Sequence, residues 1–214
     1  MILQYFFDHW DRILSLTWEH LQLTLLSIAA ALVVAVPLGI VAARYDGLRL
    51  PTFGVLGAIY TIPSLALLAF MIPVFGLGRL PAVIALVAYS QLFLVRNIVA
   101  GLRGVDPAAL EAARGMGMTQ GQLLWQVQLP LALPVILAGI RVALVTTISL
   151  ATITAWINAG GLGLLLFDGI TRDNPPQILA GTLAITVLAL LADQVMRAVE
   201  RLTSASRARQ AAKR

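Results

Sequence analysis

The chain has 214 residues, of which 59% are hydrophobic and only 12% are charged, and its mean hydropathy is +0.89. Average soluble domains are about 45–50% apolar and about 25% charged. A soluble globular domain could not cover this much apolar surface with so little charge, and the same numbers exclude intrinsic disorder. A polytopic membrane protein is the class that remains. The chain has no cysteine, which excludes disulfides, thiolate chemistry and cysteine metal sites.

Five stretches of the chain are long, apolar and nearly free of charge. A helix needs about 20 apolar residues to cross a bilayer. We therefore predict five transmembrane helices, near residues 21–43, 53–73, 81–101, 134–156 and 177–197. Proline lacks a backbone N–H and has a fixed φ, so Pro37, Pro63 and Pro134 are expected to bend or start helices.

Residues 1–20 precede these helices and have a different pattern. Apolar and aromatic residues recur there at helical spacing, with acidic residues on the other faces, which is typical of an amphipathic helix in the membrane interface. The expected fold is all-α. It comprises an interfacial N-terminal helix over residues 1–20, a transmembrane domain over residues 18–198 and a basic tail over residues 199–214.

The distribution of basic residues predicts the orientation. Of the 15 Lys and Arg residues, only Arg12, Arg79 and Arg172 fall on the same side as the N-terminus. Loops rich in Lys and Arg stay in the cytoplasm. We expect a bacterial inner-membrane protein with the N-terminus outside and the C-terminus in the cytoplasm. The net charge of +5 then reflects membrane topology, and the expected surroundings are lipid rather than nucleic acid.

The longest connection on the basic side, residues 103–133, predicts two short helices. Asp106 is a favourable N-cap, and Pro107 fits the first position of a helix. Gly115 and Gly117 are expected to end this first helix.

A second short helix is predicted from residue 120 to about residue 128. Thr119 precedes it, and Gln122 three residues later completes a capping-box pattern. Leu129 and Pro130 are expected to end it. Two capped helices tied to membrane helices on both sides would form a rigid knob that can transmit movement from a bound partner.

The same segment resembles the EAA loop of type I ABC importer permeases, which have the MetI-like fold. The matching pattern is Glu111, Ala112 and Ala113, then three residues, Gly117, nine residues, Val127 in place of the usual Ile, one residue, Leu129 and Pro130. A narrower resemblance is to the permeases of osmoprotectant importers, which carry glycine betaine, choline, carnitine and related quaternary amines. It rests on residues 101–107, 131–141, 149–152 and 159–163.

This resemblance implies partners and a mechanism. Two permease subunits, identical or different, form the pathway, and two cytoplasmic ATPase subunits bind the EAA loops. An extracytoplasmic binding protein delivers the substrate. The ATPases bind the ATP, so the permease itself is expected to be non-enzymatic, with no catalytic residue and no cofactor. Glu111 would face the ATPase as a charge partner, and Ala112, Ala113 and Gly117 would allow close approach.

Two alternatives to an osmoprotectant permease stay open. Methionine importer permeases share the fold and some of the motifs, so an amino-acid substrate is the alternative within the ABC class. A stand-alone channel or secondary carrier is the alternative from a different class. Such a protein should work without an ATPase and should tolerate loss of the knob.

One face of the fourth predicted helix is mildly polar and could line the translocation path. Its members recur at helical spacing and are Thr147, Ala151, Thr154 and Asn158. Hydroxyls without a fixed charge would suit the passage of a cation with an apolar shell. In the alternative interpretation, these hydroxyls bond to their own helix backbone or to neighbouring helices.

Three ionisable residues lie at one depth in three predicted helices. Arg96, Arg141 and Asp193 are each 14 or 15 residues from the outer end of their helix, or about 22 Å at 1.5 Å per residue. Isolated charges in a membrane are costly. We therefore predict an ion-paired cluster with Asp193 near Arg141 or Arg96, the alternative being that each side chain reaches the interface independently.

Residues 158–163 form a glycine-rich stretch, called here the glycine loop. It lacks the Gly-Lys-Ser/Thr ending of a phosphate-binding loop, and no strand precedes it. We predict a structural turn near the gate. His9 and His20 are not clustered with other ligand residues, so both are expected to be ordinary surface or interface histidines, and no metal site is predicted.

Overall fold

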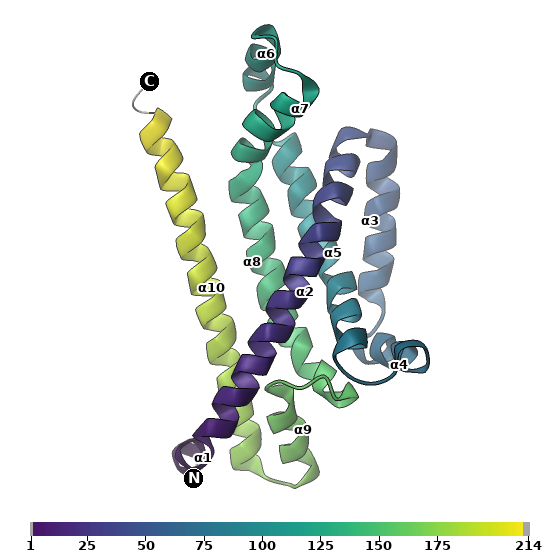
Figure 1. Ribbon diagram of the computed structural model, residues 1–214, viewed down its shortest axis with the longest axis vertical. Coiled ribbons are helices and arrows are strands. Elements are labelled where there is room, and N and C mark those ends of the chain that lie inside the picture. The colour runs from purple at the N-terminus through teal and green to yellow at the C-terminus, as the bar shows by residue number, and fades with distance from the viewer. Residues whose placement is uncertain (1, 212–214) are drawn as a thin grey trace.

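The computed structural model describes residues 2–211, and within that range the chain is helical, with no strand (Figure 1). The helices are α1 (Ile2–Asp8), α2 (Trp10–Arg44), α3 (Asp46–Thr61), α4 (Ser64–Phe75), α5 (Arg79–Arg103), α6 (Pro107–Gly115), α7 (Gln120–Gln122), the π-helix η1 (Leu123–Gln128), α8 (Leu129–Thr154), the 3₁₀-helix η2 (Ala155–Ile157), α9 (Gly163–Thr171) and α10 (Pro175–Ala211). The expected all-α class is confirmed. Residues 212–214 of the predicted tail lie outside the described residues.

Among the residues that the structure describes, four helical stretches are long and apolar enough to cross a membrane. They are Trp10–Arg44, Arg79–Arg103, Gln120–Ile157 and Pro175–Thr203. The pair α3 and α4 passes the same test as one broken unit, which allows up to five spans. Five transmembrane helices therefore stay a prediction, and the second of them requires that α3 and α4 cross the membrane as one broken span.

α2 differs from the expected division at its N-terminal end. It runs unbroken from Trp10 to Arg44, through the predicted boundary at residues 20 and 21. Separate helices over residues 1–20 and 21–43 are therefore wrong, and within the described residues only the short α1 stands apart. The change from charged to apolar residues marks a change of surroundings, whereas a helix ends only where the backbone loses its hydrogen bonds. Even Pro37 lies inside α2.

The second predicted span is broken at Pro63. α3 ends at Thr61, α4 begins at Ser64, and the two axes differ by 91°. The residue before a proline is pushed out of the helical region, and Ile62 has an extended backbone with φ −64° and ψ 128°. Tyr89 of α5 donates its hydroxyl to the carbonyl of Ile62 at 2.5 Å. A straight helix over residues 53–73 is wrong, and the expected bend at Pro63 is confirmed.

α8 also begins earlier than predicted. α7, η1, α8 and η2 form one helical stretch over Gln120–Ile157, so the expected end before Leu129 and Pro130 is wrong. The cause is the π-helical turn, in which Leu129 donates to the carbonyl of Leu124, five residues back. The wider turn leaves room for the ring of Pro130, which in a regular helix would clash with the carbonyl four residues earlier.

α5 lies at the centre of the bundle, where it packs against α2 and α8 (Figure 1). Small residues allow these close approaches. A side chain at Gly39 of α2 would overlap Ile98, and one at Gly139 of α8 would overlap Asn97. α10 packs on α8 and α9 and lies at the edge of the bundle. The bundle thus holds α6 and α7 at one end and α9 at the other.

Candidate functional site

The EAA loop forms two short capped helices at one end of the molecule (Figure 1). The carboxylate of Asp106 accepts a hydrogen bond from the backbone N–H of Ala108 at 2.9 Å. Thr119 accepts from the N–H of Gln122 at 3.4 Å, and the side chain of Gln122 accepts from the N–H of Thr119 at 2.8 Å. The predicted N-cap and capping box are both confirmed. Each cap uses groups within three residues of one another, so the loop is stabilised from within.

A tight turn joins the two helices at Gly117. Its φ is +81°, a conformation that side chains other than glycine rarely adopt. A Cβ there would meet nothing within 4 Å, so glycine is required by backbone conformation rather than by space. The N–H of Met118 donates to the carbonyl of Ala113 at 3.3 Å and closes the end of α6.

The Glu-Ala-Ala part of the EAA pattern divides between two faces of α6. Glu111 and Ala112 are exposed, whereas Ala113 is buried. The expectation that Ala113 allows a partner to approach is therefore wrong in this structure, because Ala113 packs inside the knob. Leu129 is half-buried and Pro130 is exposed, and Pro130 lines an apolar cavity of about 400 Å³.

Two large apolar side chains on the same knob were missed by sequence reasoning. Met116 is 72% exposed and Trp125 is 66% exposed. Exposed apolar side chains mark contact sites where they form a contiguous patch. Their position beside the EAA pattern was the available signal. Glu111, Ala112, Met116 and Trp125 are the exposed residues of the knob that are grouped here under the name docking face.

The base of the knob is tied to the ends of two membrane helices. Arg103, the last residue of α5, donates from Nε to the carbonyl of Ala43 at 3.1 Å and pairs with Asp46. A cavity of about 320 Å³ lies between the knob and the ends of α2 and α5. Arg103 thus links the start of the EAA loop to the end of α2 and the start of α3.

The predicted polar face of α8 lies inside the protein. Thr147 is 2% exposed and Thr154 is 1% exposed, and Ala151 is fully buried. Thr147 donates to the carbonyl of Ala143 at 2.7 Å and lies 3.0 Å from the hydroxyl of Ser90 on α5.

Thr154 donates to the carbonyl of Ala151 at 2.7 Å. This geometry contradicts an open path along Thr147, Ala151 and Thr154, and it matches the alternative of hydroxyls bonded within and between helices. Asn158 is exposed and has φ +63°. Helical spacing puts residues on one face, but only the neighbouring helices decide what that face contacts.

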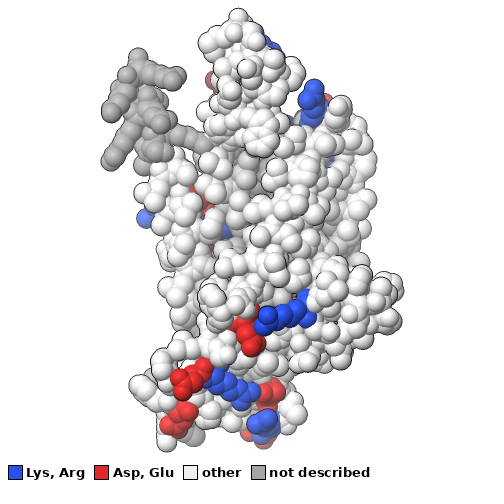
Figure 2. Space-filling model, viewed as in Figure 1, with Lys and Arg blue, Asp and Glu red and all other residues white. Residues whose placement is uncertain are grey.

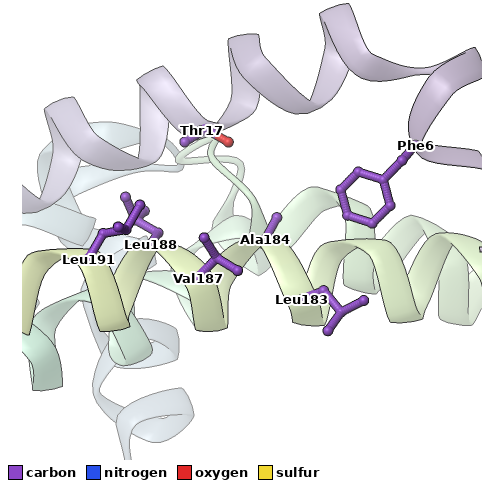
Figure 3. A pocket seen from close by; sticks show the side chains of 7 residues that line it. All are labelled: Phe6, Thr17, Leu183, Ala184, Val187, Leu188 and Leu191. Atoms are coloured by element: carbon purple, nitrogen blue, oxygen red, sulfur yellow. The ribbon is translucent and has the colours of Figure 1, made fainter. Parts of the chain in front are cut away.

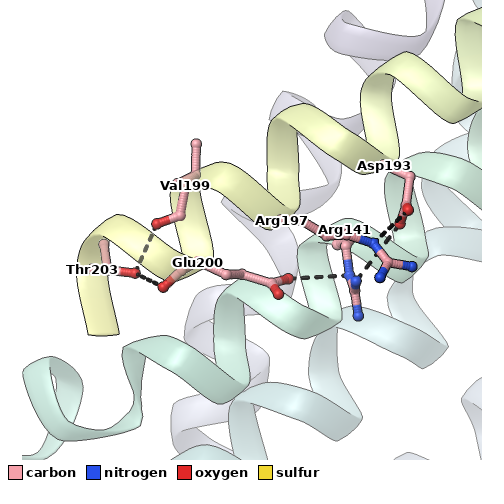
Figure 4. Close-up of polar contacts among 6 residues, drawn as sticks. All are labelled: Arg141, Asp193, Arg197, Val199, Glu200 and Thr203. Carbon is pink, nitrogen blue, oxygen red and sulfur yellow. Dashed lines mark hydrogen bonds and ion pairs between the residues drawn. The ribbon is translucent and has the colours of Figure 1, made fainter. Parts of the chain in front are cut away.

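A charge network joins α8 to α10 (Figure 4). Arg141 lies 3.7 Å from Asp193 and 3.1 Å from Glu200, and Arg197 lies 2.7 Å from the other oxygen of Asp193. The expected proximity of Asp193 and Arg141 is thus present. Sequence reasoning missed Arg197 and Glu200, which follow Asp193 by four and seven residues and so share its helix face.

Arg96 is placed elsewhere, contrary to the predicted three-residue cluster. Its guanidinium carbon lies 5.8 Å from the ring centroid of Phe53 on α3, a cation–π distance. Equal depth in the membrane gives equal height along the bundle, but it does not determine the direction in which a side chain points.

An apolar cavity of about 230 Å³ separates the N-terminal helices from α10 (Figure 3). Phe6 lies at one end, and Leu183, Val187, Leu188 and Leu191 of α10 form a wall. Thr17 lines it too, but its hydroxyl donates to the carbonyl of Ile13 at 2.7 Å. The cavity therefore offers hydrocarbon contacts and no free polar group for a charged substrate.

The glycine loop lies at the end of the molecule opposite the EAA loop (Figure 1). Acidic and basic side chains gather near this end on the face shown in Figure 2.

His20 of α2, at this end of the molecule, is 0% exposed, so its prediction as a surface or interface histidine is wrong. His9 is exposed and stacks on Tyr5 with ring centroids 4.2 Å apart. Among the described residues, no group of three or more His, Asp or Glu could hold a metal ion.

Known proteins share this sequence over most of its length. Residues 35–205 match the family described as binding-protein-dependent transport system inner membrane component. The chain is 42% identical over 203 residues to the carnitine transport permease protein OpuCB of Listeria monocytogenes, covering 94% of this chain and 93% of that protein. It is 40% identical over 200 residues to the choline transport system permease protein OpuBB of Bacillus subtilis, covering 94% and 92%.

The fold is also that of a solved transporter. The permease chain in an inward-facing conformation of the MetNI methionine ABC transporter superposes with a TM-score of 0.80. It is 23% identical in sequence, and the match covers 87% of this chain and 93% of that one. By sequence match, relatives and fold together, the chain belongs to the binding-protein-dependent transport system inner membrane components, the membrane-embedded permease subunits of ABC importers.

Proposed function

We propose that this permease works as one of two paired permease subunits, whose EAA loops are bound by two ATPase subunits. The observation that carries the proposal is the docking face, an exposed charged and apolar surface on a knob that is capped from within. A rigid knob passes on the displacement of a bound motor, whereas a flexible loop would absorb it. The tie between Arg103 and residues Ala43 and Asp46 supports transmission into α2, α3 and α5.

The proposed orientation places the EAA loop in the cytoplasm of a bacterial cell and the glycine loop outside its inner membrane. The N-terminus is then outside and the C-terminus inside. The support is the excess of Lys and Arg in the EAA-loop half of the molecule. In this orientation the docking face meets the compartment that holds ATP, and a binding protein meets the end with the glycine loop.

The proposed substrates are small quaternary amines such as carnitine, choline and glycine betaine. The relatives named above support this class, since their names specify carnitine and choline transport. The charge network supports it too. The five predicted spans contain a single acidic residue, Asp193. Its charge is paired with Arg141 and Arg197. A permanent cation would therefore meet no free carboxylate in these spans that could trap it.

Uptake into sealed vesicles tests this function. Vesicles with the permease, its ATPase subunits and a loaded binding protein should take up labelled choline or carnitine only when ATP is supplied to the ATPases. Gly117→Val should lower this uptake at least ten-fold, because valine does not tolerate φ +81°. Gly115→Val is the matched control, since Gly115 has equally open surroundings without a positive φ, and its uptake should stay within two-fold.

Other results would assign a different function. Uptake that needs no ATPase, or that survives Gly117→Val in a folded protein, would favour a stand-alone carrier. ATP-driven uptake of methionine without uptake of quaternary amines would favour the amino-acid alternative, for which the present support is likeness of fold alone.

A further inference from the structure

The glycine loop has an unusual backbone that ends one helix and begins another. Asn158, Gly160 and Gly161 have φ of 63°, 89° and 84°. Such a segment has few bonds of its own and needs outside partners to stay in one conformation. The partners come from α2, more than 130 residues earlier in the chain.

The first partner of the glycine loop is His20, and both of its ring nitrogens make contacts. The N–H of Leu162 donates to Nδ1 at 3.3 Å, and Nε2 lies 3.0 Å from the carbonyl of Ile148 on α8. These two contacts require one tautomer, with Nε2 protonated as a donor and Nδ1 free to accept. The buried ring thus joins α2, α8 and the glycine loop.

Glu19, the preceding residue, provides the second partner. Its carboxylate accepts from the N–H of Gly161 at 3.1 Å. Side chains in the loop would block this approach. A Cβ at Gly160 would lie 2.6 Å from the Glu19 carboxylate, and one at Gly161 would lie 2.9 Å from Nδ1 of His20. The glycines therefore allow two successive α2 residues to reach two successive loop amides.

The EAA loop is connected to these contacts by a single helical stretch. It runs from Gln120, beside the Thr119 cap, to Ile157 at the edge of the glycine loop. His20 contacts this stretch at Ile148, nine residues or about 14 Å before its end. A displacement of α8 against α2 must therefore change the geometry of His20 and of the loop amide that it holds.

We propose that Glu19 and His20 are positioning residues that latch the glycine loop to α2, so that ATP-driven movement of the EAA loop reaches the opposite end of the permease. This role rests on the proposed function. The latch is the pair of loop bonds, from Gly161 to Glu19 and from Leu162 to His20. The contact of His20 with Ile148 makes the latch respond to α8.

Two substitutions at His20 separate the latch from simple packing. Asn places its amide oxygen near the position of Nδ1 and keeps an acceptor for Leu162. Gln places its amide nitrogen near Nε2, so it keeps a donor for Ile148 and loses the acceptor. Hydrogen exchange of a peptide covering residues 158–163 reports the latch, and a peptide covering residues 103–118 of the EAA loop serves as an internal control.

The measurement uses the permease assembled with its ATPase subunits, without nucleotide and with ADP trapped by vanadate after ATP hydrolysis. In the wild type, exchange of residues 158–163 should change at least five-fold on trapping. His20→Gln should exchange at least ten-fold faster than wild type without nucleotide and should lose the response to trapping. His20→Asn should keep at least half of that response. The control peptide should remain within two-fold of wild type in both variants.

Equal behaviour of His20→Asn and His20→Gln, or a wild-type response in His20→Gln, would overturn the latch. If neither variant folds, the partly exposed Glu19 provides the second pair. Glu19→Gln keeps an acceptor oxygen and should retain the response, whereas Glu19→Met should lose it, and equal responses would overturn the latch. No response of wild type in either peptide would contradict the proposed function instead.

Discussion

The two ends of the molecule are ordered in opposite ways. The EAA loop is held by bonds between near neighbours, such as Asp106 with Ala108 and Thr119 with Gln122, and its docking face is exposed. The glycine loop is held by residues of α2 that lie 142 positions away in the sequence, and much of it is buried. The EAA loop can therefore move as a unit without losing its shape, whereas the shape of the glycine loop depends on where α2 and α8 lie.

The largest effect on stability is expected from Gly163→Ala at the glycine-loop end. A Cβ at Gly163 would overlap the backbone carbonyl of Thr152 and the side chain of Ala155, neither of which can move aside easily. Overpacking of this kind costs about 1–3 kcal/mol, and a clash with backbone belongs at the upper end. Chemical unfolding in detergent measures the loss of unfolding free energy.

Gly115→Ala at the EAA-loop end is the matched control. A Cβ there meets nothing within 4 Å, and alanine favours the helix by about 1 kcal/mol over glycine. Its unfolding free energy should stay equal or rise slightly. A loss as large as that of Gly163→Ala would contradict the contrast between the two ends.

An intermediate effect is expected from Arg141→Met, between the two ends. It leaves Glu200 without this cation and Asp193 with Arg197 alone. Since the carboxylates are about 21% exposed, the expected loss of unfolding free energy is about 1–2 kcal/mol, above that of an exposed pair and below that of a fully buried one. Arg197→Met is the control, because Arg197 is 49% exposed and such pairs contribute at most about 1 kcal/mol. An equal loss in both variants would show that Arg141 does not organise the network.

The smallest effect is expected from Thr119→Ala in the EAA loop. Loss of an N-cap costs about 1 kcal/mol, and here the cost should stay local. Hydrogen exchange should rise about five-fold around residues 119–123 and remain unchanged in the glycine loop. Faster exchange in the glycine loop as well would mean that the knob is not independently capped.

The contrast also explains what the sequence could predict. The caps of the EAA loop involve residues two or three apart, so Asp106, Thr119 and Gln122 were assigned correctly from spacing alone. The apolar stretches likewise predicted the long helices. The 91° angle between α3 and α4 and the π-turn before Pro130 depend on packing partners. One such partner is Tyr89, which donates its hydroxyl to the carbonyl of Ile62.

The predictions for Thr147, Thr154, Arg96 and His20 failed for the same physical reason. Helical spacing predicted that Thr147 and Thr154 share one face of α8. It could not predict that this face is buried, as it is where Thr147 contacts Ser90 of α5. Equal depth predicted that Arg96 lies near Arg141, but Arg96 instead contacts the ring of Phe53 on α3. His20 appeared ordinary because its partners, Ile148 and Leu162, are 128 and 142 residues away, and no local pattern records them.

Cross-linking from single cysteines tests the central claim most directly, because the natural chain contains none. Glu111→Cys and Asn158→Cys place one thiol on the docking face and one on the glycine loop, both at exposed positions. In cells that make the whole transporter, a thiol-to-lysine cross-linker should join Glu111→Cys to the ATPase subunit and leave Asn158→Cys unattached to it. Cross-linking of the ATPase to Asn158→Cys, or labelling of Glu111→Cys by an impermeant reagent outside intact cells, would contradict the account.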